Sequence, residues 1–165
     1  MASAPSSSNP TGITTELPTS TLPHVQTVYL TQKQNSPIYA FLLSDLKLVS
    51  ATSGTITATL TLQPLHCNSK GTLHGTASAC LVDWAAGMAI ASQGEGHTYT
   101  GVSTDLSVSY LGTAKVGDVL VVEGRALKIG GTLGFFEVLV YKEVDGQRKL
   151  IVKGSHTKYL KKPGN

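Results

Sequence analysis

The sequence predicts an α+β domain in which an antiparallel sheet of about six strands curls around one buried helix. Residues 76–91, which read TASACLVDWAAGMAIA, are apolar or small on every side, as expected of a helix that is buried all round. Strand-like segments precede and follow this helix, and short glycine-rich turns separate them. Connections this short favour antiparallel hairpins over crossover units.

The first 35 residues are rich in serine, threonine and proline, which predicts a flexible arm over residues 1–35. The globular domain is expected at 36–160, with a short tail at 161–165. A few apolar residues allow the last third of the arm to dock on the domain: Leu22, Val25, Val28, Tyr29 and Leu30.

Local signals predict the other elements in chain order. Ser36 and Pro37 are typical of the N-cap and first residue of a helix, and a short apolar stripe follows them. Alternating residues predict strands at 46–51 and 55–63, ahead of a loop and the buried helix. After a break at Gly94-Glu95-Gly96, further strands are predicted at 99–111, 119–129, 133–143 and 150–160.

Composition argues against several classes of protein. The net charge is +3 and charged residues make up 14%, without the basic runs of a nucleic-acid-binding module. No apolar run has the length and lack of charge of a membrane span. Cys67 and Cys80 have neither metal-ligand spacing nor a disulfide pattern, and the histidines also lack ligand spacing, so no metal site is predicted. The first residues resemble neither a signal nor a transit peptide, which favours the cytoplasm, with the mitochondrion as the alternative.

Asp83 is the only charge in the predicted buried helix. An unpaired buried carboxylate costs several kcal/mol or becomes protonated, so this residue is a candidate for chemistry. The alternative is a carboxylate that neighbouring backbone groups satisfy. Because the desolvation cost disappears with the charge, replacing Asp83 with Asn is expected not to weaken the fold.

The start of the same helix is a candidate site for negative charge. Gly75 lets a ligand approach the backbone, where unpaired N–H groups and the positive end of the helix dipole are exposed. His74 and Asp83 are nine residues apart, about half a turn round the helix and roughly 13 Å along it. They cannot pair on one helix, so a joint site requires a second copy of the chain.

Five motifs, together with the strand order, resemble the hotdog-fold acyl-CoA thioesterases: NSKGTLHG, LVDWAAGMA, GVSTDLSVSYL, LKIGGTLGF and VKGSHTKYL. The resemblance is greatest to the subgroup of thioesterase superfamily member 2, which is related to the phenylacetate-pathway thioesterases. It covers residues 36–160, and the combination of HG, LVD and GVSTD is its most specific part.

The resemblance implies a catalytic role for Asp83, as general base on water or as nucleophile. It implies that the Gly75 N–H polarises the thioester carbonyl, that Asn68 and His74 hold substrate and loop, and that Ser103 positions water. In this family the carboxylate and the helix start come from different subunits. The expected assembly is therefore a homodimer, arranged as a dimer of dimers, and no cofactor or metal is needed.

The resemblance also implies a coenzyme A site formed by Lys128, Gly130, Gly131 and Thr132. Tyr110 is a further substrate-binding candidate, as is Tyr159, where relatives commonly have histidine. Several lysines are candidates for binding the coenzyme phosphates, although lysines more commonly solvate a surface: Lys115, Lys128, Lys158, Lys161 and Lys162.

The predicted function is hydrolysis of an acyl-CoA thioester, as in fatty acid metabolism. One alternative is a non-catalytic acyl-CoA-binding protein, which would gain nothing from a costly carboxylate. The other is a hydratase on the same fold. A hydratase needs neighbouring aspartate and histidine side chains, and no such pair is recognised in the sequence.

Overall fold

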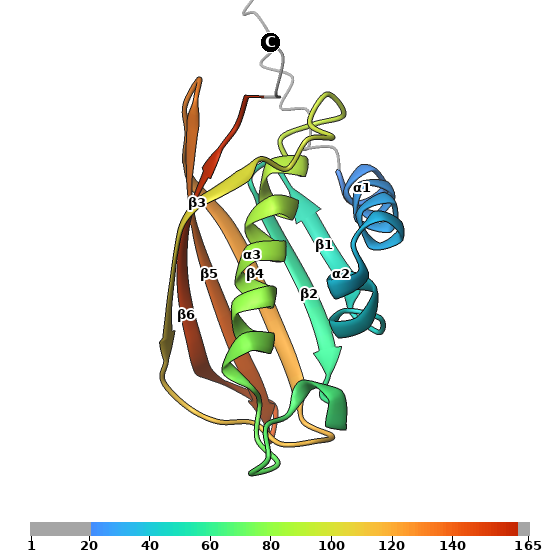
Figure 1. The fold of residues 1–165 in the computed structure, drawn as a ribbon, viewed down its shortest axis with the longest axis vertical. Coiled ribbons are helices and arrows are strands. Elements are labelled where there is room, and N and C mark those ends of the chain that lie inside the picture. Colours follow the sequence, from blue (N-terminus) through green and yellow to red (C-terminus); the bar gives the residue numbers. More distant parts are fainter. Residues whose placement is uncertain (1–20, 162–165) are drawn as a thin grey trace, which may run out of the picture.

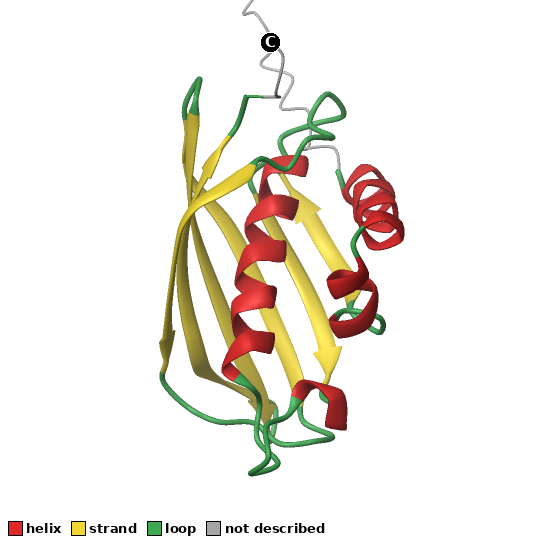
Figure 2. Cartoon of the chain, in the orientation of Figure 1, coloured by secondary structure: helices red, strands yellow, loops and turns green. Residues whose placement is uncertain are grey.

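The structure, a computed structural model, describes residues 21–161, which form one sheet and three helices of more than one turn. The elements run in this order: α1 (Leu22–Asn35), α2 (Pro37–Leu42), β1 (Lys47–Thr52), β2 (Thr55–Thr61), a 3₁₀ turn (Pro64–His66), α3 (Gly75–Ala91), β3 (Val102–Tyr110), β4 (Val119–Ile129), β5 (Leu133–Val144) and β6 (Gln147–Tyr159). Figures 1 and 2 show the sheet curving around α3, which confirms the predicted α+β arrangement.

The sheet order is β1-β2-β4-β5-β6-β3, and every pair of neighbours is antiparallel. The predicted hairpins are present for β1–β2, β4–β5 and β5–β6. The expectation of a hairpin between β3 and β4 is wrong, because β3 pairs with β6 at the far edge of the sheet. Residues 111–118 are too many for a tight turn, so they allow the chain to pass from β3 at the edge of the sheet to β4 in its interior.

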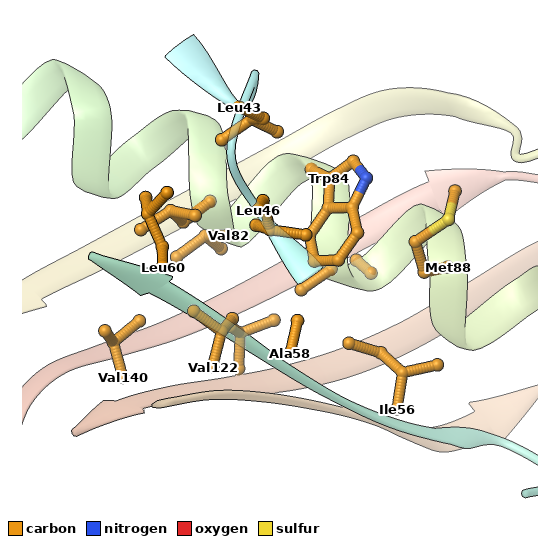
Figure 3. Packing of buried hydrophobic residues seen from close by; sticks show 14 of the residues in the cluster. Leu43, Leu46, Ile56, Ala58, Leu60, Val82, Trp84, Met88, Val122 and Val140 are labelled. Carbon is orange, nitrogen blue, oxygen red and sulfur yellow. The ribbon is translucent and has the colours of Figure 1, made fainter. Parts of the chain in front are cut away.

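The core lies between α3 and the concave face of the sheet, and small residues let the two approach closely. Trp84 and Met88 of α3 are fully buried, and Figure 3 shows them among the apolar side chains of β2, β4 and β5. A Cβ atom at Gly124 would lie 2.8 Å from the carbonyl oxygen of Ala85, and one at Gly154 would lie 2.6 Å from Val82. Glycine at these positions therefore lets β4 and β6 contact α3.

Residues 22–35, at the end of the predicted arm, form α1 and dock on the domain as their apolar residues allowed, so the ordered part of the chain begins before residue 36. Val25, Val28 and Tyr29 are buried, and the Tyr29 ring packs edge-to-face on Trp84 at a centroid distance of 5.3 Å. These residues recur at helical spacing, which gives α1 an apolar face despite its polar composition. The rest of the predicted arm, residues 1–20, and tail residues 162–165 lie outside the described residues.

The α2 helix begins as predicted, with Pro37 in its first turn and Ser36 at the N-cap position. The Ser36 side chain makes no capping hydrogen bond. Of the two predicted start signals, only Pro37 therefore acts in the structure, because its fixed φ angle suits the first turn of a helix. Within residues 21–161, no helix has the length and apolarity to cross a membrane.

Docking of α1 should contribute measurably to stability. Tyr29→Ala removes the ring that packs on Trp84 and is expected to lower the free energy of unfolding by about 3 kcal/mol. Leu30→Ala is the matched control, because Leu30 is 58% exposed on the same helix. Urea unfolding of both variants would measure the difference, and equal effects would show that α1 does not hold the core.

Candidate functional site

Asp83 lies on α3 where three other elements converge on its carboxylate. The Tyr39 hydroxyl, from α2, donates to Asp83 Oδ2 at 2.7 Å. Oδ1 accepts hydrogen bonds from Ser103 Oγ of β3 at 3.0 Å and from Lys158 Nζ of β6 at 2.9 Å. The Asp83 side chain remains 31% exposed, so these donors hold a carboxylate that solvent and ligands still reach.

The pairing of β3 with β6 explains why Ser103 and Lys158 meet the same carboxylate oxygen. They are direct cross-strand partners, so their side chains leave the sheet on the same face. The register shifts immediately after Ser103, between Ser103 and Asp105, and irregularities of this kind commonly re-aim side chains beside active sites. The structure thus brings together two of the predicted site residues, Asp83 and Ser103.

Three side chains beside Asp83 were not predicted from the sequence: Tyr39, His156 and Lys158. Lys158 was considered only as a surface cation, yet its side chain is 5% exposed. Alternation along β6 was the available signal, because Gly154, His156 and Lys158 share the face that packs on α3. For Tyr39 the sequence held no such signal, since the packing of α2 against α3 is a long-range contact.

His156 corrects the expectation that no histidine lies beside the carboxylate. Its Nε2 atom is 3.6 Å from Asp83 Oδ1. The His156 side chain is 0% exposed, however, so it cannot contact a substrate as a hydratase histidine must. The pair therefore lends no support to the hydratase alternative.

The electrostatics of the site keep Asp83 charged. Burial raises its pKa, but the Lys158 charge and the hydrogen bonds from Lys158, Tyr39 and Ser103 outweigh that effect and lower the pKa below its usual value. Burial and the nearby Asp83 charge raise the pKa of Tyr39 far above its usual range, so its hydroxyl stays a donor. Burial, reinforced by the Lys158 charge, lowers the pKa of His156 to about 4, so this ring is neutral at pH 7.

A second site lies at the start of α3, in a cavity of about 480 Å³. His74 is the N-cap residue, and its Nδ1 accepts a hydrogen bond from the Thr76 N–H at 3.0 Å. The Tyr110 hydroxyl donates to the carbonyl oxygen of Gly75 at 3.3 Å and would lie 3.2 Å from a Cβ atom at that position. His74, Gly75 and Tyr110, three of the predicted site residues, therefore line one cavity at the positive end of the helix.

Asn68 shapes the loop that leads into this cavity. Its Oδ1 accepts from the N–H groups of Lys70 at 2.9 Å and Thr72 at 3.3 Å, and its Nδ2 donates to Thr72 Oγ1 at 3.0 Å. Asn68 therefore contributes hydrogen bonds to the loop and is not among the groups that contact Asp83.

The predicted coenzyme segment forms the β4–β5 turn. The Gly130 N–H donates to the Leu133 carbonyl at 2.8 Å, and the Leu160 N–H donates to the Thr132 carbonyl at 2.8 Å, next to Tyr159. A Cβ atom at Gly131 would meet no atom within 4 Å, so the turn itself does not require glycine there. Lys128 is exposed, and in Figure 1 this turn lies at the end of the sheet opposite the start of α3.

Within one copy of the chain, Asp83 and the cavity at the start of α3 therefore lie in two separate places. Gly75 and Asp83 are eight residues apart on α3, about 12 Å along its axis. Asp83 does not line the cavity at the helix start. Among the described residues, no group of three metal-ligating side chains gathers at either place.

Comparisons with known proteins show which family this chain resembles in sequence and in fold. The sequence profile of the thioesterase superfamily matches residues 70–149. Human acyl-coenzyme A thioesterase 13 is 38% identical over 118 residues, which are 72% of this chain and 81% of the human one. The crystal structure of zebrafish thioesterase superfamily member 2 superposes with a TM-score of 0.75 at 34% identity, covering 85% of this chain and 98% of that one.

A protein from Streptococcus mutans, solved with acetyl CoA bound, superposes with a TM-score of 0.64 at 25% identity. The superposition covers 71% of this chain and 89% of that one. Together with the zebrafish structure, this likeness confirms the predicted hotdog fold.

His156 should make stability depend on pH. Its pKa is 6.5 when unperturbed and about 4 in the folded protein, so over that interval the unfolded chain binds a proton that the folded chain does not. The free energy of unfolding should hold above about pH 6.5 and decline by an amount on the order of a few kcal/mol as the pH falls toward 4. Urea unfolding across this pH range should show that the free energy of unfolding declines less in His156→Gln than in the wild type. In the control His97→Gln, which replaces an exposed histidine, the decline should equal that of the wild type. An unchanged decline in His156→Gln would contradict this assignment.

Proposed function

The chain belongs to the thioesterase superfamily, and we propose that it hydrolyses the thioester of an acyl-CoA to a free acid and coenzyme A. The observation that carries the proposal is Asp83, a charged and solvent-accessible carboxylate beside a serine hydroxyl in an otherwise apolar helix. The name of the human relative and the acetyl CoA bound to the Streptococcus mutans protein support the substrate class.

In the proposed reaction Asp83 acts on the carbonyl carbon through a water molecule. The carboxylate takes a proton from water, the water oxygen attacks the carbonyl carbon, and the C–S bond breaks. The sulfur leaves with a proton as the thiol of coenzyme A, and the acyl group leaves as the acid. Ser103, which already donates to Asp83 Oδ1, is close enough to help position that water. Direct attack by the carboxylate is the alternative route.

The developing negative charge on the carbonyl oxygen would be held by the Gly75 N–H at the start of α3. Backbone donors and a helix dipole aimed at such an oxygen typically contribute about 10²–10³ in rate. Because Gly75 and Asp83 of one chain are too far apart for one thioester group, we infer that each site uses Asp83 of one copy and Gly75 of another.

The free edge of β3 supports this division between copies. β3 borders β6 on one side and has no described neighbour on the other. It carries several exposed apolar side chains, which are typical of an interface: Val102, Leu106 and Tyr110. Pairing through this edge would put Asp83 and the cavity at the start of α3 next to a second chain. A dimer of dimers remains the proposed assembly.

The β4–β5 turn is the proposed contact for coenzyme A. Its exposed Lys128 offers a positive charge to a phosphate, and the open space at Gly131 lets a ligand approach the backbone. Tyr159, which is 40% exposed beside this turn, offers an aromatic face. The turn and the helix start lie at opposite ends of one chain, so the coenzyme would also span two copies.

Asp83→Asn should separate an enzyme from a binding protein. Removing the base should lower kcat by at least about a hundredfold on the best substrate among acetyl-, octanoyl- and palmitoyl-CoA, measured by thiol release. Affinity for a non-hydrolysable acyl-CoA thioether should stay within about threefold. The control is Asp45→Asn, an exposed aspartate outside the site, which should retain wild-type turnover.

Unchanged turnover in Asp83→Asn would exclude Asp83 as the catalytic carboxylate. A wild-type protein that binds the thioether but hydrolyses none of these substrates would favour the binding-protein alternative. Label found in the Asp83 carboxylate after a single turnover in ¹⁸O-labelled water would establish direct attack, because the route through water labels only the acid product.

A charge on the free edge of β3 should disrupt the dimer. Leu106→Arg is expected to shift the protein to monomers in light scattering and to abolish turnover, since Asp83 and the helix start would no longer meet in one site. Val49→Arg is the matched control at the opposite edge of the sheet, on β1, where the side chain is 54% exposed. A fully active monomer would rule out a site shared between copies.

A further inference from the structure

We propose that Lys158 is a positioning residue for this reaction: its buried ammonium keeps Asp83 charged and occupies Oδ1, so that Oδ2 is the oxygen that acts on water or substrate. This inference rests on the proposed function of Asp83. It assigns to Lys158 a role inside the site rather than one in binding the coenzyme phosphates.

The burial of Lys158 is unusual and is matched by one counter-charge. Lysine side chains are almost never fully buried unless they are paired. Lys158 lies on an interior strand, its side chain is 5% exposed, and its Nζ is 2.9 Å from Asp83 Oδ1. Gly101 also covers the base of this side chain, since a Cβ atom there would lie 3.3 Å from Lys158 Cβ. The ammonium is thus shielded from the solvent in which a coenzyme phosphate would approach.

The donors around Asp83 distinguish its two oxygens. Oδ1 accepts from Ser103 and Lys158 and lies 3.6 Å from His156 Nε2. Oδ2 accepts only from Tyr39 among the described residues. Each carboxylate oxygen has about two acceptor directions, so those of Oδ1 are filled and one of Oδ2 stays open. A water molecule or a thioester carbon therefore meets Oδ2.

Lys158 is also the only positive charge among the described groups that face Asp83. Tyr39 of α2 keeps its proton, and burial raises the pKa of the Cys80 thiol of α3 to about 12, so both are neutral. His156 of β6 is neutral at pH 7, and Ser103 of β3 does not titrate. Asp105 of β3 acts on His156 and carries the opposite sign.

Loss of Lys158 should therefore remove the strongest of the interactions that oppose the effect of burial on the pKa of Asp83, and leave only the hydrogen bonds from Tyr39 and Ser103. Burial favours the protonated carboxyl, so the pKa of Asp83 would rise. Since the reaction needs the carboxylate, activity in the variant would be lost at a higher pH than in the wild type. The same change would leave binding of the nucleotide end of the substrate intact.

The test compares Lys158→Met with Lys153→Met in the full chain. Lys153 is the matched control, because it lies on the same strand but is 56% exposed and pairs with Glu137. With the best of the three acyl-CoAs, Lys158→Met should lower kcat at pH 7 at least about tenfold, with KM within about threefold. The acid limb of its pH profile should move up by at least about one pH unit. Lys153→Met should match the wild type in kcat, in KM and in the acid limb of the pH profile.

Two kinetic outcomes would overturn the proposal. A wild-type pH profile in Lys158→Met would show that the ammonium does not control the charge of Asp83. A raised KM with unchanged kcat would instead assign Lys158 to binding of the coenzyme.

A stability cycle tests the ion pair without any substrate. Asp83→Asn leaves a buried ammonium without a counter-charge, so the melting temperature should fall by at least about 5 °C, contrary to the expectation from sequence. Adding Lys158→Met to that variant should restore most of the loss, whereas additive losses would contradict the pair. If the wild type hydrolyses no acyl-CoA, the proposed function fails, and this cycle still decides whether Lys158 holds Asp83.

Should Lys158→Met fail to fold, the wild-type protein supplies the measurement. Carbon-13 NMR of the Asp83 carboxyl should show a titration midpoint below ~3.9, the value for an unperturbed aspartate. A midpoint at or above that value would overturn the proposal.

Discussion

The ion pair between Asp83 and Lys158, 2.9 Å long, lies between the central helix and the sheet. A charge in an apolar helix is tolerated only when other groups compensate for its lost hydration. Here the compensation comes from three elements that are distant in sequence, through Tyr39, Ser103 and Lys158. The positions of α2, β3 and β6 around α3 are therefore tied to the charge state of one side chain.

This arrangement depends on how closely the sheet approaches α3. Glycines at 124 and 154 let β4 and β6 contact the helix backbone and Val82, where larger residues would collide. Beyond Gly154, the same face of β6 carries His156 and Lys158 toward Asp83. On this face of β6, the glycine that packs against α3 is thus followed directly by the two polar residues that lie beside Asp83.

Asp83 and the start of α3 have opposite electrostatics. At the start of α3, backbone N–H groups and the dipole favour a negative charge, in a cavity that His74 and Tyr110 border. Farther along the helix, a carboxylate offers negative charge to an acidic proton or an electrophilic carbon. A thioester needs both at once, on its oxygen and on its carbon, and the length of the helix keeps them apart within one copy. In the proposed reaction, association of two copies would complete the site.

Much of the fold could be predicted from the sequence because its signals are local. The uniform apolarity of residues 76–91, the alternation of the strands and the glycine turns predicted α3, the hairpins β1–β2, β4–β5 and β5–β6, and each strand to within about three residues at its ends. The same local reading predicted the anion site at Gly75 and singled out Asp83 as a charge in apolar surroundings. The motif resemblance added Ser103, which the structure places against Asp83.

Only the tertiary structure decided the partners of that charge. The pairing of β3 with β6 at the edge of the sheet aligned Ser103 with Lys158. The docking of α1 and α2 brought the Tyr39 hydroxyl to Asp83 Oδ2. The apolar residues of α1 indicated that this segment could dock but not on which surface, and lysine side chains normally lie in solvent. Sequence patterns report the preferences of each segment, whereas the surroundings of a buried charge depend on which segments pack together.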